Sequence, residues 1–197
     1  MAVTEWNEAT RAELADMERE GVTSFKAYMA YENLRVNDKE LLELFKATAD
    51  IGVVGVHCEL GDEVNSRVAR LLAEGKTGPE WHPRSRPNEV ESLAVRRCLA
   101  LAREAGGNAW VVHLSTRAGL AEIEAARGTG QRVLVETCPQ YLTLTDEVYE
   151  KPDFEGAKFV CSPPIRSEAD KAALWGGIKA GEVDIISTDH CSFNFKR

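Results

Sequence analysis

The sequence contains no apolar run long enough to cross a membrane. Its two most apolar stretches, IGVVGVHC and NAWVVHLS, have the length of strands, whereas a membrane-spanning helix needs about 20 apolar residues. The first residues, MAVTEWNEATRAELADMEREG, are acidic and lack the basic and then apolar layout of a signal peptide. We therefore expect no membrane partner.

Basic patches and paired cysteines are also lacking. Lys and Arg number 24 against 32 Asp and Glu, a formal net charge of −8, and no basic stretch is interleaved with aromatic residues. Nucleic acid is therefore not an expected partner. The five cysteines contain no CxxC pair and are widely spaced, at Cys58, Cys98, Cys138, Cys161 and Cys191. This pattern argues against a disulfide framework or a zinc knuckle and favours reduced, buried thiols in the cytoplasm.

Strand-like and helix-like segments alternate along the chain. The expected strands are 22–29, 52–59, 109–115, 132–138 and 183–191. Helices are expected at 4–20, behind an N-cap at Asp38, and at 88–105, 117–127 and 167–179. The helix at 88–105 has the clearest apolar face, formed by Val90, Leu93, Ala94, Cys98, Leu101 and Ala102. This alternation predicts an α/β fold with a parallel sheet.

The sequence has no glycine-rich phosphate-binding turn of the GxGxxG or GxxxxGK[ST] type, which an open nucleotide-binding sheet usually carries. A (β/α)8 barrel instead places polar residues at the C-terminal ends of its strands. Four such residues are present, Lys26, His57, His113 and Asp189. Each alone has an ordinary structural explanation, but four on one rim predict a metal site. The loops 75–88 and 139–166 are long enough to be functional.

These residue types suit amide hydrolysis. A bound zinc ion lowers the pKa of water to about 7 and polarises a carbonyl, and neutral imidazole and carboxylate are its usual ligands. A protonated lysine would be repelled by cations, but burial lowers the pKa of a lysine. The neutral amine can add carbon dioxide to become a carbamate, an anion able to bridge two metals.

The sequence resembles the dihydropyrimidinase and D-hydantoinase branch of the amidohydrolase superfamily. The matching pieces follow the family order over essentially all 197 residues: GVTSFKAYMAY, VHCELGD, RPNEVESLAVRRCLALA, VVHLST, VLVETCPQYL, CSPPIR and STDHCSF. The resemblance implies a cyclic-amide hydrolase acting on dihydropyrimidines or hydantoins. It also implies two zinc ions, or other divalent metals, and a homotetramer.

The resemblance assigns a role to each site residue. Lys26 would be the carboxylated bridging ligand, and His57 and His113 would bind one metal. Asp189 would bind the second metal and act as general base. Tyr31 would stabilise the oxyanion, and Ser162 would contact the ring amide of the substrate. Without the resemblance, the favoured interpretation of Tyr31 is a packing aromatic, and that of Ser162 is a turn residue before two prolines.

The match departs from the family pattern in two places. The family often has Ala-Glu-Asn after its histidine, where this chain has Cys58, Glu59 and Leu60; we expect this to alter the groups around the metal. The family's His-x-His pair is absent, since the only other histidines are His82 and His190. We therefore expect one incomplete catalytic domain over residues 1–197, corresponding to barrel strands four to eight, that is incompetent by itself.

Alternatives remain within and outside the enzyme class. Allantoinase and dihydroorotase are other cyclic amidases, and the FKAYMAY and CSPP segments favour the hydantoinase branch over both. Non-catalytic scaffold proteins of the same family have lost their metal ligands, whereas Lys26, His57, His113 and Asp189 are retained here. An α/β fold with coincidental polar strand ends is the remaining interpretation.

Overall fold

A parallel β-sheet forms the centre of the molecule. The computed structural model describes residues 1–191, which form a five-stranded sheet in the order β1-β2-β3-β4-β5. The strands are β1 (Ser24–Tyr28), β2 (Val53–His57), β3 (Ala109–Val111), β4 (Val133–Thr137) and β5 (Ile185–Ile186). Each strand pairs in parallel with the next one in the sequence. The expected α/β class is confirmed, and the sheet has the strand order of a (β/α)8 barrel segment.

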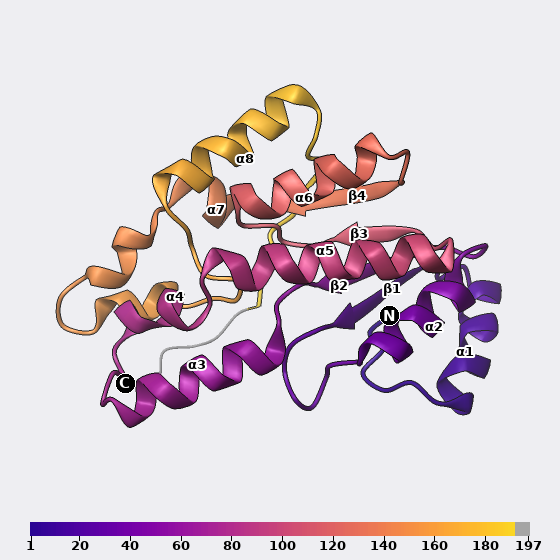
Figure 1. Cartoon of the computed structure of the whole chain (residues 1–197), viewed down its shortest axis with the longest axis horizontal. Helices are drawn as coiled ribbons and strands as arrows, with labels where there is room; N and C mark the ends of the chain where they lie inside the picture. The colour runs from indigo at the N-terminus through magenta and orange to yellow at the C-terminus, as the bar shows by residue number, and fades with distance from the viewer. Residues whose placement is uncertain (192–197) are drawn as a thin grey trace.

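Helices connect the strands and cover one face of the sheet. The longer helices are α1 (Glu8–Arg19), α2 (Asp38–Thr48), α3 (Gly61–Ala73), α5 (Asn88–Ala105), α6 (Arg117–Gly128) and α8 (Glu168–Ala180). Along that face α2 contacts α5, α5 contacts α6 and α6 contacts α8, as Figure 1 shows. Within residues 1–191, no helix combines the length and apolarity required for a membrane span.

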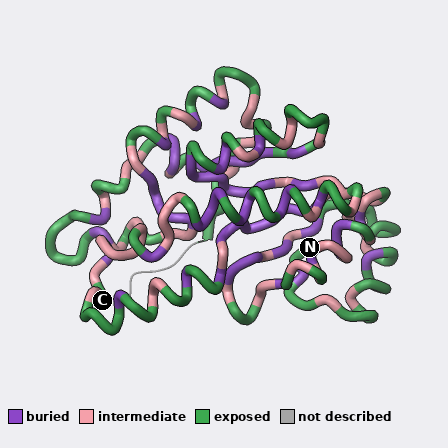
Figure 2. The backbone as a smooth tube through the Cα atoms, viewed as in Figure 1, coloured by how far each residue is buried: buried purple, intermediate pink, exposed green. Residues whose placement is uncertain are grey.

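The burial of β1 alternates along the strand, so that its two faces differ. Phe25 and Ala27 are buried in the hydrophobic core, whereas Ser24, Lys26 and Tyr28 are exposed or half-buried. Figure 2 shows the buried segments concentrated along the strands and the helix faces that pack on them. The face that carries Lys26 is therefore the one that lines the interior of a barrel.

The N-terminal residues pair with the outer edge of β1. The Lys26 amide donates to the Met1 carbonyl at 2.7 Å, and the Val3 amide donates to the Lys26 carbonyl at 2.7 Å. Val3 itself is buried. The backbone of Lys26 is thus fixed from the side opposite β2, and the edge of β1 is covered at this point.

Several boundaries differ from the sequence-based expectation. The strand expected over 109–115 ends at Val111, and the one expected over 183–191 contains only Ile185–Ile186. The N-cap of α2 is Asn37 rather than Asp38, because Asn37 and Glu40 form a reciprocal capping box. Helix α3 was not predicted from the sequence; in the structure it buries Gly61, Val64 and Leu71.

The apolar face predicted for α5 is rotated in the structure. Leu93 is 44% exposed, whereas the Glu91 carboxylate is buried. The two long loops contain short helices: η1 (Pro79–Trp81), α4 (His82–Ser85), α7 (Pro139–Thr143), η2 (Asp146–Glu150) and η3 (Glu155–Phe159). These pieces fold over the C-terminal ends of the strands and bring their own side chains toward the rim.

Candidate metal and substrate site

Lys26 is the central residue of β1, and its amine is buried on the face of the sheet that would line the interior of a barrel. Its Nζ atom is buried and has no hydrogen-bond partner among the described residues. It lies 5.0 Å from the centroid of the Tyr28 ring. Burial lowers the pKa of Lys26 to about 8, although Cys58, Asp189 and Glu136 act in the opposite direction. About a tenth of the amine is therefore neutral at pH 7, and the neutral form is the one that reacts with an electrophile.

His57 and His113 face each other across neighbouring strands. His57 is the last residue of β2, and His113 follows β3 by two residues. Nδ1 of His57 lies 3.0 Å from Nε2 of His113, and both side chains are buried. Burial lowers the pKa of each well below the usual value, and Lys26 lowers both further. Both rings are thus neutral, the form that binds metals.

The spacing of these two nitrogens suits one cation. A tetrahedral zinc ion with bonds of about 2.0–2.1 Å holds two donor nitrogens roughly 3–3.5 Å apart. The 3.0 Å separation also allows a hydrogen bond between the rings. The unpartnered Nζ of Lys26 lies in the same interior, where an uncompensated ammonium would be costly. The donor types and their arrangement therefore fit a metal-binding group.

Asp189 joins Lys26 and His113 around one cavity. The cavity has a volume of about 350 Å³, and its walls include Lys26, His113, Glu136, Ser187 and Asp189. Asp189 lies three residues beyond β5 and is exposed. The Ser187 hydroxyl donates to Glu136 at 2.6 Å. Within residues 1–191, no cluster of three or more His, Cys, Asp or Glu side chains is arranged to hold a metal, so any site here depends on Lys26.

Tyr31 and Ser162 meet at the C-terminal side of β1 and β2. The Tyr31 and His57 ring centroids lie 5.0 Å apart. Burial raises the pKa of Tyr31, while a hydrogen bond with the Ser162 side chain lowers it. The Arg86 guanidinium lies 5.8 Å from the centroid of the Tyr31 ring. The tyrosine hydroxyl and the serine hydroxyl therefore stand together beside the histidine pair.

Three site residues adopt an unusual backbone conformation. Tyr31, His113 and Asp189 have φ values of 70°, 41° and 44°, in the left-handed region that non-glycine residues rarely adopt. All three follow the end of a strand, where such a conformation turns the chain sharply off the sheet. This strain is of the kind found at functional sites. The same turn explains why β3 ends before His113.

A ring of buried carboxylates and arginines surrounds these residues. Glu59 accepts hydrogen bonds from His57 and Arg86, and burial raises the pKa of Glu59 while Arg86 lowers it. Glu91, on α5, accepts from the Ser115 amide at 3.0 Å and the Ser115 hydroxyl at 2.8 Å, and also from Thr116. Glu91 thereby fixes the turn that directly follows His113.

The sequence interpretation missed Arg86, Glu91 and Glu136. Arg86 lies in the segment predicted as a loop, Glu91 is not among the residues predicted for the apolar face of its helix, and Glu136 lies inside a predicted strand. The alternation of β4 offered one signal, since it places Glu136 on the same face as Leu134, opposite the buried Val133 and Val135. Glu59 was noticed only as part of a triplet that departs from the family.

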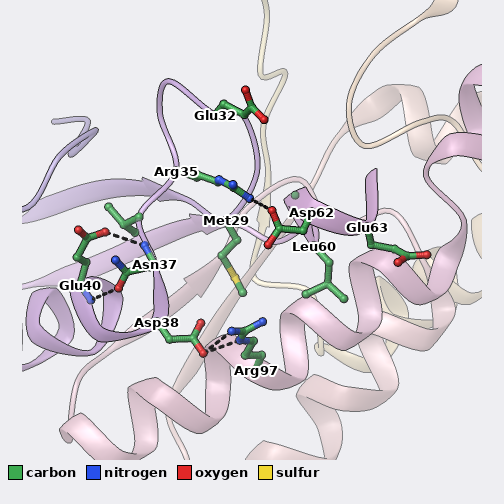
Figure 3. A pocket seen from close by; sticks show the side chains of 12 residues that line it. Met29, Glu32, Arg35, Asn37, Asp38, Glu40, Leu60, Asp62, Glu63 and Arg97 are labelled. Atoms are coloured by element: carbon green, nitrogen blue, oxygen red, sulfur yellow. Dashed lines mark hydrogen bonds and ion pairs between the residues drawn. The ribbon is translucent and has the colours of Figure 1, made fainter. Parts of the chain in front are cut away.

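A second, larger cavity lies between residues 29–40 and the helices α3 and α5. Its volume is about 630 Å³, and Figure 3 shows its charged lining. Arg35 pairs with Asp62, and Arg97 pairs with Asp38. These ion pairs fasten the segment after Tyr31 to the neighbouring helices. Five carboxylates and two arginines line this cavity, so its lining is net negative. Because both arginines are engaged in ion pairs that join neighbouring elements, we assign the cavity a structural role.

No protein-family model matches this chain. The D-hydantoinase of Streptomyces coelicolor is 40% identical over 197 residues, which are 99% of this chain and 42% of that protein. The chain is homologous to the D-hydantoinases. The D-hydantoinase of Bacillus sp. AR9 superposes with a TM-score of 0.96 at 39% identity, covering 99% of this chain and 43% of that one.

The dihydropyrimidinase of Brevibacillus agri gives the same TM-score of 0.96 at 40% identity, with 98% of this chain and 43% of that chain covered. This chain therefore spans about two-fifths of the length of the hydantoinases it matches. The expected resemblance to the hydantoinase and dihydropyrimidinase branch is confirmed, and so is the expected partial barrel.

Proposed function

We propose that this chain carries a metal site for hydrolysis of the cyclic amide bond of hydantoins or dihydropyrimidines. The supporting observation is the pair of nitrogens, Nδ1 of His57 and Nε2 of His113, 3.0 Å apart beside the buried, unpartnered Nζ of Lys26. Zinc or another divalent metal, as a pair in the whole enzyme, would supply Lewis acidity and a more acidic water.

In this proposal Lys26 acts after modification. Its neutral amine attacks the carbon of carbon dioxide, a C–N bond forms, and the nitrogen loses a proton to give a carbamate anion. The lowered pKa of Lys26, about 8, provides the neutral amine. The carbamate, His57 and His113 would hold one metal, and the carbamate and Asp189 would contribute to the second.

The remaining residues act on the substrate. Asp189, exposed at the cavity wall, takes the proton of the attacking water as general base. The hydroxyl of Tyr31 donates a hydrogen bond to the oxygen on which negative charge develops. Ser162, hydrogen-bonded to Tyr31, binds the amide of the ring. The substrate is a small uncharged cyclic amide or ureide, and the tetrameric assembly and cytoplasmic location belong to the same proposal.

The test uses the purified chain with zinc and ¹³C-labelled bicarbonate. We expect one tightly bound zinc per chain and a ¹³C carbamate resonance that disappears in Lys26→Ala. His57→Ala and His113→Ala should lose the zinc, whereas the control Lys39→Ala, at an exposed position on α2, should keep both signals. Zinc uptake that is the same in all four variants would overturn the proposal.

A further inference from the structure

A fully buried carboxylate contacts the histidine at the end of β2. The Glu59 side chain is 0% exposed. Its Oε2 atom lies 2.8 Å from Nε2 of His57 and 2.6 Å from Nη1 of Arg86, while its Oε1 atom has no partner among the described residues. One carboxylate oxygen therefore serves two donors that come from different parts of the chain.

Stability alone does not explain this arrangement. Moving a carboxylate out of water is costly, and a buried ion pair often contributes less than apolar residues of the same volume. Leaving the second oxygen unpartnered raises that cost. The group is better explained by what its first oxygen does to His57.

The contact with Glu59 selects one tautomer of His57. A carboxylate only accepts hydrogen bonds, so the nitrogen 2.8 Å from it, Nε2, carries the proton. The lone pair of the neutral ring is then on Nδ1, the atom that lies 3.0 Å from Nε2 of His113. In the other tautomer a nitrogen lone pair would face the carboxylate oxygen, and Nδ1 would be unable to bind a metal.

Arg86 holds the carboxylate in this orientation. Its guanidinium pairs with Glu59, and its backbone carbonyl accepts a hydrogen bond from Arg166. The same guanidinium lies 5.8 Å from the centroid of the Tyr31 ring. Arg86 therefore contacts both Glu59, the carboxylate bonded to His57, and the ring of Tyr31.

We propose that Glu59 and Arg86 are positioning residues that fix His57 as the Nε2–H tautomer and so present its Nδ1 lone pair to a metal. This inference rests on the proposed function in so far as a metal binds at His57. Partners of this kind orient metal-binding histidines, and their loss typically lowers metal affinity about 10- to 100-fold.

The experiment records long-range ¹H–¹⁵N spectra of the metal-free chain labelled with ¹⁵N-histidine. The chain has 4 histidines, and His57→Gln assigns the signal of interest. His82 is an internal reference, because its Nε2 lies 2.7 Å from the Cys161 carbonyl and so carries a proton. We expect His57 to show the same Nε2–H pattern as His82.

The variants then separate positioning from folding. Glu59→Leu should move His57 away from the Nε2–H form and weaken zinc binding about 10- to 100-fold. Glu59→Gln keeps an oxygen acceptor and should keep the tautomer, with a smaller loss of affinity. Arg86→Met should weaken zinc binding, and Arg86→Lys should restore most of it. Glu63→Gln, at a carboxylate that pairs with Arg67 on the surface of α3, is the matched control and should change neither signal.

The outcomes distinguish this inference from the proposed function. If the unaltered chain binds zinc through His57 and His113 but Glu59→Leu leaves tautomer and affinity unchanged, the positioning role is wrong and the proposed function stands. If His57 shows a Glu59-dependent Nε2–H tautomer but the chain takes up no zinc, the positioning of His57 stands and the proposed function is wrong. Should Glu59→Leu not fold, an Nδ1–H tautomer of His57 in the unaltered chain would by itself overturn the inference.

Discussion

Replacing Lys26 by methionine should make the metal-free protein more stable. Methionine has a similar length and no charge, so it fills the same space without burying an ammonium. The pKa of Lys26 falls from its ordinary 10.5 to about 8 on folding. Each step of one in pKa corresponds to about 1.4 kcal/mol, so the protonated lysine lowers the free energy of unfolding by about 3 kcal/mol.

The stability gained by Lys26→Met should decrease as pH rises. Between about pH 8 and 10.5 the unfolded chain binds more protons at Lys26 than the folded chain, so the stability of the unaltered protein rises with pH there. The advantage of Lys26→Met should be complete, about 3 kcal/mol, near pH 6.5, and should fall to about 1 kcal/mol near pH 9.5.

Urea denaturation in carbon dioxide-free buffer at these two pH values measures the difference in free energy of unfolding between Lys26→Met and the unaltered chain. Lys39→Met, at an exposed position on α2, is the control and should show little change at either pH. Adding bicarbonate should stabilise the unaltered chain, through carbamate formation, and leave Lys26→Met unchanged. Equal stabilities of chain and variant at both pH values, or an advantage that grows with pH, would refute the assignment of Lys26 as a destabilised buried amine.

Two further predictions concern the framework of the site. Phe45→Ala, at a side chain that is 0% exposed, should lower the free energy of unfolding by about 3–5 kcal/mol in a urea titration; a loss below about 1 kcal/mol would contradict the assigned core. Glu91→Gln should cost about 1–3 kcal/mol, because the anchor of Ser115 and Thr116 is weakened. It should also weaken zinc binding by displacing His113, and unchanged affinity would show that the turn holds without Glu91.

The fold was predictable because strands covered by helices carry continuous apolar runs. The segments around Val54, Val111 and Val135 are of this kind, and their alternation with amphipathic helices predicted the parallel sheet. The strand ends were less predictable, because a left-handed residue such as His113 ends a strand without any change in hydrophobicity.

The polar residues of the candidate site stand out in the sequence, whereas the residues that contact and position them do not. Lys26, His57 and His113 stand out because polar groups interrupt apolar runs. Arg86 lies 27 residues from Glu59, and Glu91 lies 24 residues from Ser115. These pairs come together only because the 75–88 segment and α5 pack on the strand ends. No local sequence pattern predicts such a contact.

The last prediction is that this chain by itself binds one metal tightly and shows no turnover. In the proposed site Lys26, His57 and His113 would hold one metal, but the second position would have only the modified Lys26 and Asp189. His82 is engaged with the Cys161 carbonyl at 2.7 Å. Within the described part of the chain, no cluster of three His, Cys, Asp or Glu side chains compensates for this shortage.

Two protein ligands hold zinc poorly, and the general base needs an activated water at a fixed place. Leu134 on β4 and Ile186 on β5 are 41% and 53% exposed, and such apolar surface favours association of chains. The measurement is zinc content after dialysis in bicarbonate, with hydantoin hydrolysis followed in parallel and the association state determined by light scattering. Two tightly bound zinc ions per chain with clear turnover would contradict the prediction, because a further donor, such as His190 or a residue of a neighbouring copy, would then have to complete the second site.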